Sequence, residues 1–126
     1  MFLLIDLSTQ QSINLGLFDA NSLVEKKTLG SNRDLLLAID NFCSEQNIDS
    51  RTIGGIVVVV GAGSFTNTRI ATTAANTFGY VLKIPLLAIK KEFLGKLPDI
   101  IPQLLSQPIG QYCSAIYSAE PNIGRK

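Results

Sequence analysis

The segment GAGSFTN combines two glycines with hydroxyl side chains directly after the apolar run IVVVV. Glycines between a strand and a helix often cradle phosphate, because the free N–H groups of a helix N-terminus attract anions. A P-loop also needs a lysine, which this segment lacks, and a Rossmann fingerprint needs a third glycine where Asn67 stands. Two hypotheses follow: weak phosphate binding, or a tight turn in which Gly61 and Gly63 supply unusual backbone angles. In the second, Ser64 or Thr66 caps the helix.

Asp6 is the carboxylate best placed for metal chemistry, because it ends the first apolar run and is followed by Leu-Ser-Thr. A metal-dependent hydrolase needs several acids that converge on divalent ions. The other acidic residues early in the chain fall in turns, on a polar strand or on a helix, and none is placed beside Asp6; they are Asp19, Glu25, Asp34 and Asp40. A turn or capping role is the simpler interpretation of Asp6.

Nucleophilic chemistry finds little support in the composition. The chain has no histidine, which excludes Ser-His and Cys-His nucleophiles and the common zinc sites built on histidine. Cys43 and Cys113 share no close-spaced motif, and we expect both to be reduced core residues. We expect no catalytic residue, no metal and no cofactor.

The elements that would position these residues form one domain. Apolar and alternating patterns predict strands at 2–6, 12–18 and 23–29, joined by short turns as an antiparallel meander. The pattern then gives a helix, a strand, a helix and a strand, at residues 33–46, 53–60, 66–78 and 82–89. The alternation at 12–18 predicts a half-buried strand, whereas the unbroken apolar run at 53–60 is typical of a central strand. This order predicts a mixed sheet with packed helices, the ribonuclease H-like fold that is also the half-domain of actin-like ATPases.

The two predicted helices differ in character. The first is capped by Ser31 or Asn32 and buries one face; its apolar residues at helical spacing are Leu35, Leu36, Ile39, Phe42 and Cys43. The second carries a stripe of small residues that lets another element approach closely; the stripe and its end are Ala71, Ala74, Ala75 and Phe78. That stripe packs either on the sheet of the same chain or on a second protein. Prolines punctuate the rest, where we expect helical turns at 91–97 and 100–105, a last strand at 111–117 and a loosely held tail.

Charge and hydropathy limit the partners. A net charge of +1 leaves no broad footprint for nucleic acid. The longest uncharged apolar run, residues 53–62, is too short to span a bilayer. The N-terminal MFLLID has no basic region before its apolar residues, so we expect no signal peptide and a cytoplasmic location.

Two segments together resemble the TsaB (YeaZ) family. MFLLIDLSTQQSINLGLFD resembles the family's opening strand, turn and strand, and VVVVGAGSFTNTRIATTAANTFGYVLKIPLLAI resembles its Gly-Pro-Gly-Ser-Phe-Thr-Gly signature with the helix and strand that follow. The tail YSAEPNI is similar to the family's C-terminus. The resemblance implies an actin-like ATPase fold without catalysis of its own. TsaB proteins are noncatalytic partners of the enzyme TsaD and, with the ATPase TsaE, support formation of threonylcarbamoyladenosine beside the tRNA anticodon.

The resemblance assigns residues by position. The signature loop matches at Gly61, Gly63, Ser64, Phe65, Thr66, Arg69 and Ile70, and the opening turn, which could hold phosphate, matches at Asp6, Ser8 and Thr9. The family joins TsaD, or itself, through helices of this domain, which predicts a partner interface at Ile70, Ala71, Ala74, Ala75 and Phe78. Departures are Ala62 for the usual proline, Asn67 and Thr68 for glycine and a leucine-like residue, and Ala71 for a glycine. Residues 1–90 match the N-terminal domain, and we expect residues 91–126 to pack on it as an extension without the second lobe that would enclose a nucleotide.

Three functions remain open from the sequence. The first is a noncatalytic subunit that binds a TsaD-like protein, and possibly a TsaE-like ATPase, forms a homodimer in isolation and meets tRNA only through the complex, with no membrane association. The second is a small nucleotide-binding or metal-dependent hydrolase of the ribonuclease H-like class that uses Asp6. The third is a degenerate paralogue that only self-associates.

Overall fold

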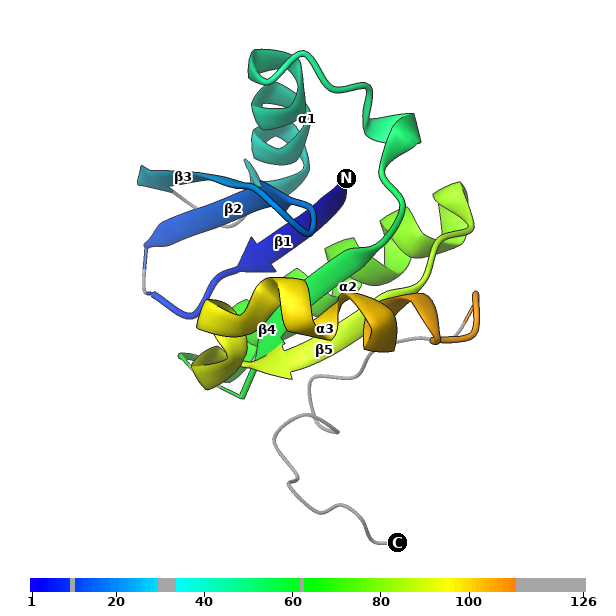
Figure 1. Ribbon diagram of the computed structural model, residues 1–126. Helices are drawn as coiled ribbons and strands as arrows, with labels where there is room; N and C mark the ends of the chain where they lie inside the picture. The colour runs from blue at the N-terminus through cyan, green and yellow to red at the C-terminus, as the bar shows by residue number, and fades with distance from the viewer. Residues whose placement is uncertain (10, 30–33, 62, 111–126) are drawn as a thin grey trace, which may run out of the picture.

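A five-stranded mixed sheet forms the centre of the structure, a computed structural model that describes residues 1–9, 11–29, 34–61 and 63–110 (Figure 1). The strand order is β3-β2-β1-β4-β5. The strands are β1 (Phe2–Asp6), β2 (Ser12–Phe18), β3 (Leu23–Leu29), β4 (Ile56–Val60) and β5 (Leu86–Lys90). Strands β1, β2 and β3 pair antiparallel, whereas β4 is parallel to β1 and β5 is parallel to β4. The predicted meander and mixed sheet are confirmed.

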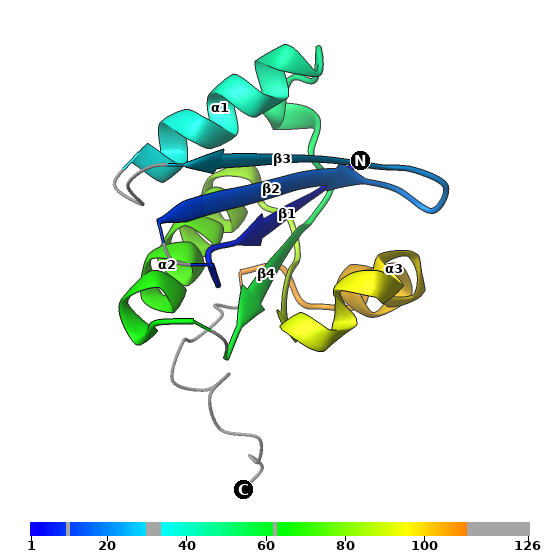
Figure 2. The ribbon, with the colours of Figure 1, turned by 90° about the vertical axis from the view of Figure 1, so that its left-hand side faces the viewer.

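Helices cover both faces of this sheet (Figure 2). Helices α1 (Leu35–Glu45) and α2 (Phe65–Leu82) pack on one face, where their apolar residues join β1, β2 and β4 in the larger core cluster. The 3₁₀-helix η3 (Lys91–Lys96) and helix α3 (Leu97–Leu105) lie on the other face, where α3 joins β4 and β5 in a second cluster. A short 3₁₀-helix, η2 (Ser50–Thr52), precedes β4. No helix in the described ranges has the length and apolar character needed to cross a membrane.

Burial on both faces explains the apolar runs of the central strands. Along β1, Leu3 and Ile5 belong to the α1–α2 side, whereas Leu4 belongs to the α3 side. The same alternation divides β4, so every residue of that strand is buried. The expectation that β2 is half-buried is wrong, because Phe18 also packs into the α3 side and Gly16 is covered by Leu4.

Helix α2 runs one turn further than the sequence indicates. Gly79 was expected to end the helix, but it lies inside it and is buried. A Cβ atom at this position would lie 2.7 Å from Leu86 Cδ2, so the glycine serves the close packing of α2 on β5. The helix ends instead at Lys83, which has a left-handed backbone (φ 56°) and donates its N–H to the Gly79 carbonyl.

The segment after β5 folds as the prolines allow. The turns predicted at 91–97 and 100–105 are η3 and α3, with Pro98 in the first turn of α3, where a missing N–H costs nothing. Helix α1 is shorter than the predicted 33–46, and its N-cap residue Asp34 makes no side-chain capping bond. Several predictions fall outside the described residues: the caps at 31 and 32, the strand at 111–117, Cys113 and the tail.

The packing of α3 generates a prediction about stability. Leu104 is fully buried against the sheet, whereas its neighbour Leu105 is exposed. We expect Leu104→Ala to lower the free energy of unfolding by about 2–5 kcal/mol, because it leaves a cavity in the core. Leu105→Ala, the matched control, should change it by less than about 0.5 kcal/mol. Urea denaturation followed by circular dichroism measures both, and equal effects would show that α3 lies outside the cooperative core.

Candidate functional site

The glycine loop packs against the turn that follows β1. Gly61 and Gly63 both have left-handed backbone angles, with φ of 78° and 76°. A Cβ atom on Gly63 would lie 2.5 Å from the Ser8 carbonyl oxygen and 2.9 Å from the Ser8 Cα. Glycine is therefore required at 63 both for its backbone angle and for the close approach of two loops of the same chain. This geometry is that of the tight turn considered from the sequence.

Side chains of the loop are engaged by the fold itself. Ser64 is the N-cap of α2, and its Oγ accepts a hydrogen bond of 3.0 Å from the Asn67 backbone N–H. Asn67 Nδ2 donates to the Leu7 carbonyl at 3.3 Å, which ties the start of α2 to the end of β1. The cap is thus Ser64, and Thr66 lies exposed in the first turn of the helix.

Asp6 has a local structural role. Its side chain is buried, and its Oδ1 accepts a 2.9 Å hydrogen bond from the Ser8 backbone N–H, as in an Asx turn. The turn closes where the Ser12 N–H donates to the Thr9 carbonyl, and the buried Ser8 Oγ has no hydrogen-bond partner among the residues that the structure describes. Within the described part of the chain, no three His, Cys, Asp or Glu side chains gather where they could hold a metal ion.

The alanine stripe of α2 faces the chain's own sheet. Ala71 and Ala75 are 0% exposed and Ala74 is 7% exposed, all within the α1–α2 core cluster. The expected contact of Ala71 and Ala75 with a partner is therefore corrected: these small side chains bring α2 close to β4 and β1. Ile70 and Phe78, also expected at the interface, are half-buried against the same cluster.

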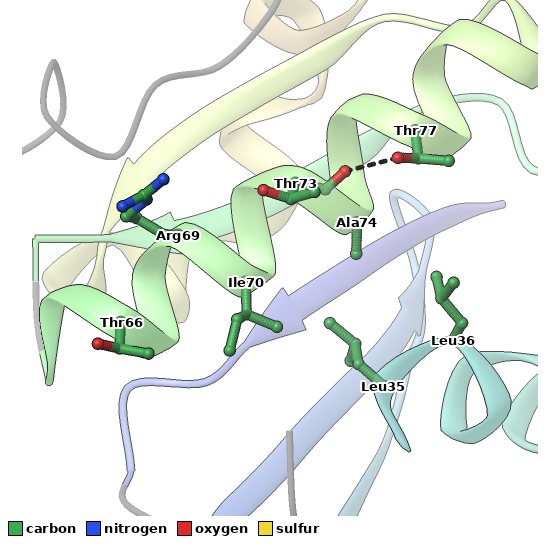
Figure 3. Close-up of a pocket in the computed structure, with 8 residues that line it drawn as sticks. All are labelled: Leu35, Leu36, Thr66, Arg69, Ile70, Thr73, Ala74 and Thr77. Carbon is green, nitrogen blue, oxygen red and sulfur yellow. Dashed lines mark hydrogen bonds between the residues drawn. The ribbon is translucent and has the colours of Figure 1, made fainter. Parts of the chain in front are cut away.

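A groove of about 480 Å³ lies instead between α1 and α2 (Figure 3). Ile70 and Ala74 of α2 point toward Leu35 and Leu36 of α1 across its floor. The lining is completed by polar residues of α2, namely Thr66, Arg69, Thr73 and Thr77. The groove thus has an apolar floor and a polar side that carries one positive charge. Of the predicted site residues, it brings together Thr66, Arg69, Ile70 and Ala74.

Sequence reasoning missed the contribution of α1. Leu36 was expected in the buried face of this helix, but it is 53% exposed, and Leu37 beside it is exposed as well. The available signal was the triplet Leu35-Leu36-Leu37, because three successive apolar residues cannot all face one side of a helix. Only Leu35 is buried, which leaves the other two leucines at the surface.

Cys43 lies in the core under α1. Burial raises the pKa of its thiol, and the charge of Asp40 raises it further, so the reactive thiolate is disfavoured. The prediction that this cysteine is a core residue is confirmed.

A sheet of order 3-2-1-4-5 with α1 and α2 on one face defines an α/β protein of the actin-like ATPase, ribonuclease H-like fold. Residues 30–92, half of the chain, match the family described as "TsaD: tRNA N6-adenosine threonylcarbamoyltransferase". The chain therefore belongs to the TsaD family. No curated protein matches it.

Two solved structures share the fold. They are "YeaZ from Pseudomonas aeruginosa" and an uncharacterized protein with similarity to peptidase YeaZ from Pseudomonas aeruginosa. Each is 22% identical to this chain and has a TM-score of 0.63. The match covers 71% of the present chain in both cases. The matched region is 44% of the first structure and 42% of the second, so the chain spans less than half of either. The predicted actin-like fold and the relationship to TsaB (YeaZ) proteins at the level of that fold are confirmed.

The contact between the two loops can be tested by adding one methyl group. We expect Gly63→Ala to lower the free energy of unfolding by at least about 2 kcal/mol, because alanine is strained at this φ and its Cβ overlaps the Ser8 backbone. Gly95→Ala is the matched control and should be nearly neutral, since among the described residues no atom beyond its chain neighbours and local helix backbone lies within 4 Å of its Cβ position. Thermal and urea unfolding compare the two. A Gly63→Ala protein as stable as the wild type would contradict the described loop contact.

Proposed function

We propose that this chain is a noncatalytic interaction subunit, resembling TsaB, that supports a TsaD-like protein in threonylcarbamoylation of the tRNA adenosine next to the anticodon. Membership of the TsaD family and the YeaZ fold support a role in this tRNA modification. In this proposal a TsaE-like ATPase joins the complex, which is cytoplasmic. The chain contacts tRNA only through that complex.

The groove between α1 and α2 is the observation that carries the proposal. Its floor is apolar, and Leu36 at its edge leaves more than half of its surface exposed. Large apolar side chains beside a groove mark surfaces that bind other proteins. A groove of this kind between two helices accommodates the apolar face of a partner helix, and its threonines and Arg69 would lie along the polar flank of that helix. The interface therefore moves from the alanine stripe to the outward side of the same helix and to α1.

The loop geometry supports the noncatalytic part of the proposal. A loop that binds phosphate at a helix N-terminus needs backbone N–H groups that can reach the anion. Here Gly63 packs directly on Ser8, and Ser64 and Asn67 are hydrogen-bonded within the chain. A phosphate would have to separate these loops before it could bind between them.

A single charge in the groove tests the proposed interface. We expect Leu36→Asp to weaken binding to the TsaD-like protein of the source organism by about 2 kcal/mol, roughly thirtyfold in Kd, because the carboxylate must be desolvated against the apolar floor. Leu37→Asp is the control, since Leu37 is equally exposed on α1 but does not line the groove. Calorimetry with the purified proteins measures the affinity, and threonylcarbamoyladenosine formation in the reconstituted system should fall with it. Undiminished binding by Leu36→Asp, or equal loss in both variants, would contradict the groove as the interface.

A second experiment tests the absence of catalysis. We expect no ATP hydrolysis by the isolated chain with Mg²⁺, and the same result for Asp6→Asn, because Asp6 is committed to the turn after β1. Phosphate release and calorimetry with ATP and Mg²⁺ provide the measurement. Hydrolysis that Asp6→Asn abolishes would support the hydrolase alternative and overturn the noncatalytic assignment.

A further inference from the structure

Strand β3 is an edge of the sheet, and all but one of its residues are exposed (Figure 1). In the described part of the chain it pairs with β2 alone. Three of its apolar side chains face solvent: Leu23, Val24 and Leu29, the last of them 80% exposed. The backbone N–H and C=O groups of this seven-residue edge that point away from β2 form a template for pairing with another strand.

The two faces of β3 can be assigned from its contacts. Lys26 Nζ lies 2.6 Å from Glu45 Oε1 of α1, so Lys26 points to the α1–α2 side of the sheet. Leu23 lies beside Gly16 and Leu4, on the α3 side. Because side chains alternate along a strand, Glu25, Lys27 and Leu29 share the α3 side with Leu23. That side reads Leu, Glu, Lys, Leu in order along the strand.

We propose that two copies of this chain associate by antiparallel pairing of β3 about a twofold axis at Lys26, which extends the sheet across both subunits. In this register Leu23 faces Leu29 of the partner subunit, and Glu25 faces Lys27 of the partner subunit. The symmetry repeats each contact, so the α3 side carries two apolar pairs and two opposite-charge pairs. Cross-strand pairs of both kinds stabilise a sheet.

The charges select this register over its neighbours. A shift by two residues in one direction places Glu25 opposite itself, and a shift in the other direction places Lys27 opposite itself. Like charges directly opposite each other destabilise a sheet. A shift by one residue would put the α3 side of one subunit in line with the α1–α2 side of the other. Only the register centred on Lys26 uses all seven residues and pairs every charge on the α3 side with its opposite.

The two lysines require a separate argument, because lysine on an edge strand ordinarily opposes association. Lys27 has Glu25 of the partner subunit opposite it in the proposed register. The two Lys26 side chains face each other on the α1–α2 side, but each is bound by both carboxylate oxygens of its own Glu45, at 2.6 and 2.7 Å. That carboxylate offsets the repulsion between them. The lysines therefore favour one partner, a second copy of this chain, and oppose strands that lack the complementary charges.

This association is independent of the proposed function. The α1–α2 groove contains no residue of β3, so a dimer formed through β3 uses none of the groove's residues. An interface of one strand pair lies at the small end of specific interfaces, so we expect a reversible dimer that depends on concentration.

Charge reversal provides a decisive experiment on the full chain. We expect Glu25→Lys and Lys27→Glu each to raise the dimer dissociation constant about tenfold, because each replaces two opposite-charge pairs with two like-charge pairs. An equimolar mixture of the two variants should dimerise again, since every pair between the two different chains is complementary. Matched controls are Glu92→Lys and Lys91→Glu, the same changes at adjacent exposed residues of η3. Sedimentation velocity over a concentration series measures association, and circular dichroism checks that each variant is folded.

The proposal is supported if each variant alone dimerises weakly and the equimolar mixture of the two variants dimerises as the wild type does. A wild-type chain that stays monomeric at all concentrations would overturn it, and so would a dimer that neither variant weakens. A dimer that Leu36→Asp abolishes and the charge reversals leave intact would place self-association in the groove. Loss of TsaD-like binding in Leu36→Asp with β3 pairing unaffected would separate this inference from the proposed function.

Discussion

The contact between Gly63 and the backbone of Ser8 is the constraint on which the rest of the domain depends. β1 and β4 are parallel neighbours, so the turns that follow them lie side by side at the carboxyl ends of these two strands. Because Gly63 has no side chain, the second turn can lie directly on the first. Ser64 then caps α2, and Asn67 fastens its first turn to Leu7. The direction in which α2 leaves the sheet is fixed at this point.

The small residues of α2 allow the helix to pack closely on the sheet along the direction set by the loop. With Ala71 and Ala75 fully buried, α2 lies close to β4, and Gly79 allows the same closeness to β5 further along. Helix α2 therefore packs close to the sheet, and α1 packs next to it on β2. Between the two helices, the apolar side chains of Leu35 and Ile70 line the groove. The groove is thus a product of close packing elsewhere in the same helix.

Strand bounds were predictable from the sequence because period-two and unbroken apolar patterns are local signals, and the first three strands fall where the patterns place them. The glycine loop was predictable as a turn, but its contact with Ser8 depends on the pairing of β1 with β4, which joins residues far apart in the chain. The same reason explains the two largest errors. Gly79 reads locally as a helix end, but contact with Leu86 gives it a place inside the helix. Leu36 reads as part of an apolar face, but only the position of α2 shows that it lies on the groove.

The departures from the TsaB signature have a common physical effect. Where the signature has glycine, Asn67 carries a side chain that donates to Leu7, and Ala71 carries a methyl group buried in the core. Both residues therefore make contacts inside the chain: Asn67 with the end of β1, and Ala71 with the core under α2. A loop that binds phosphate must keep its N–H groups available and its entrance open. In this chain the loop is instead closed on the preceding turn, so its free energy of interaction stabilises the orientation of α2 and, through it, the groove that α2 forms with α1.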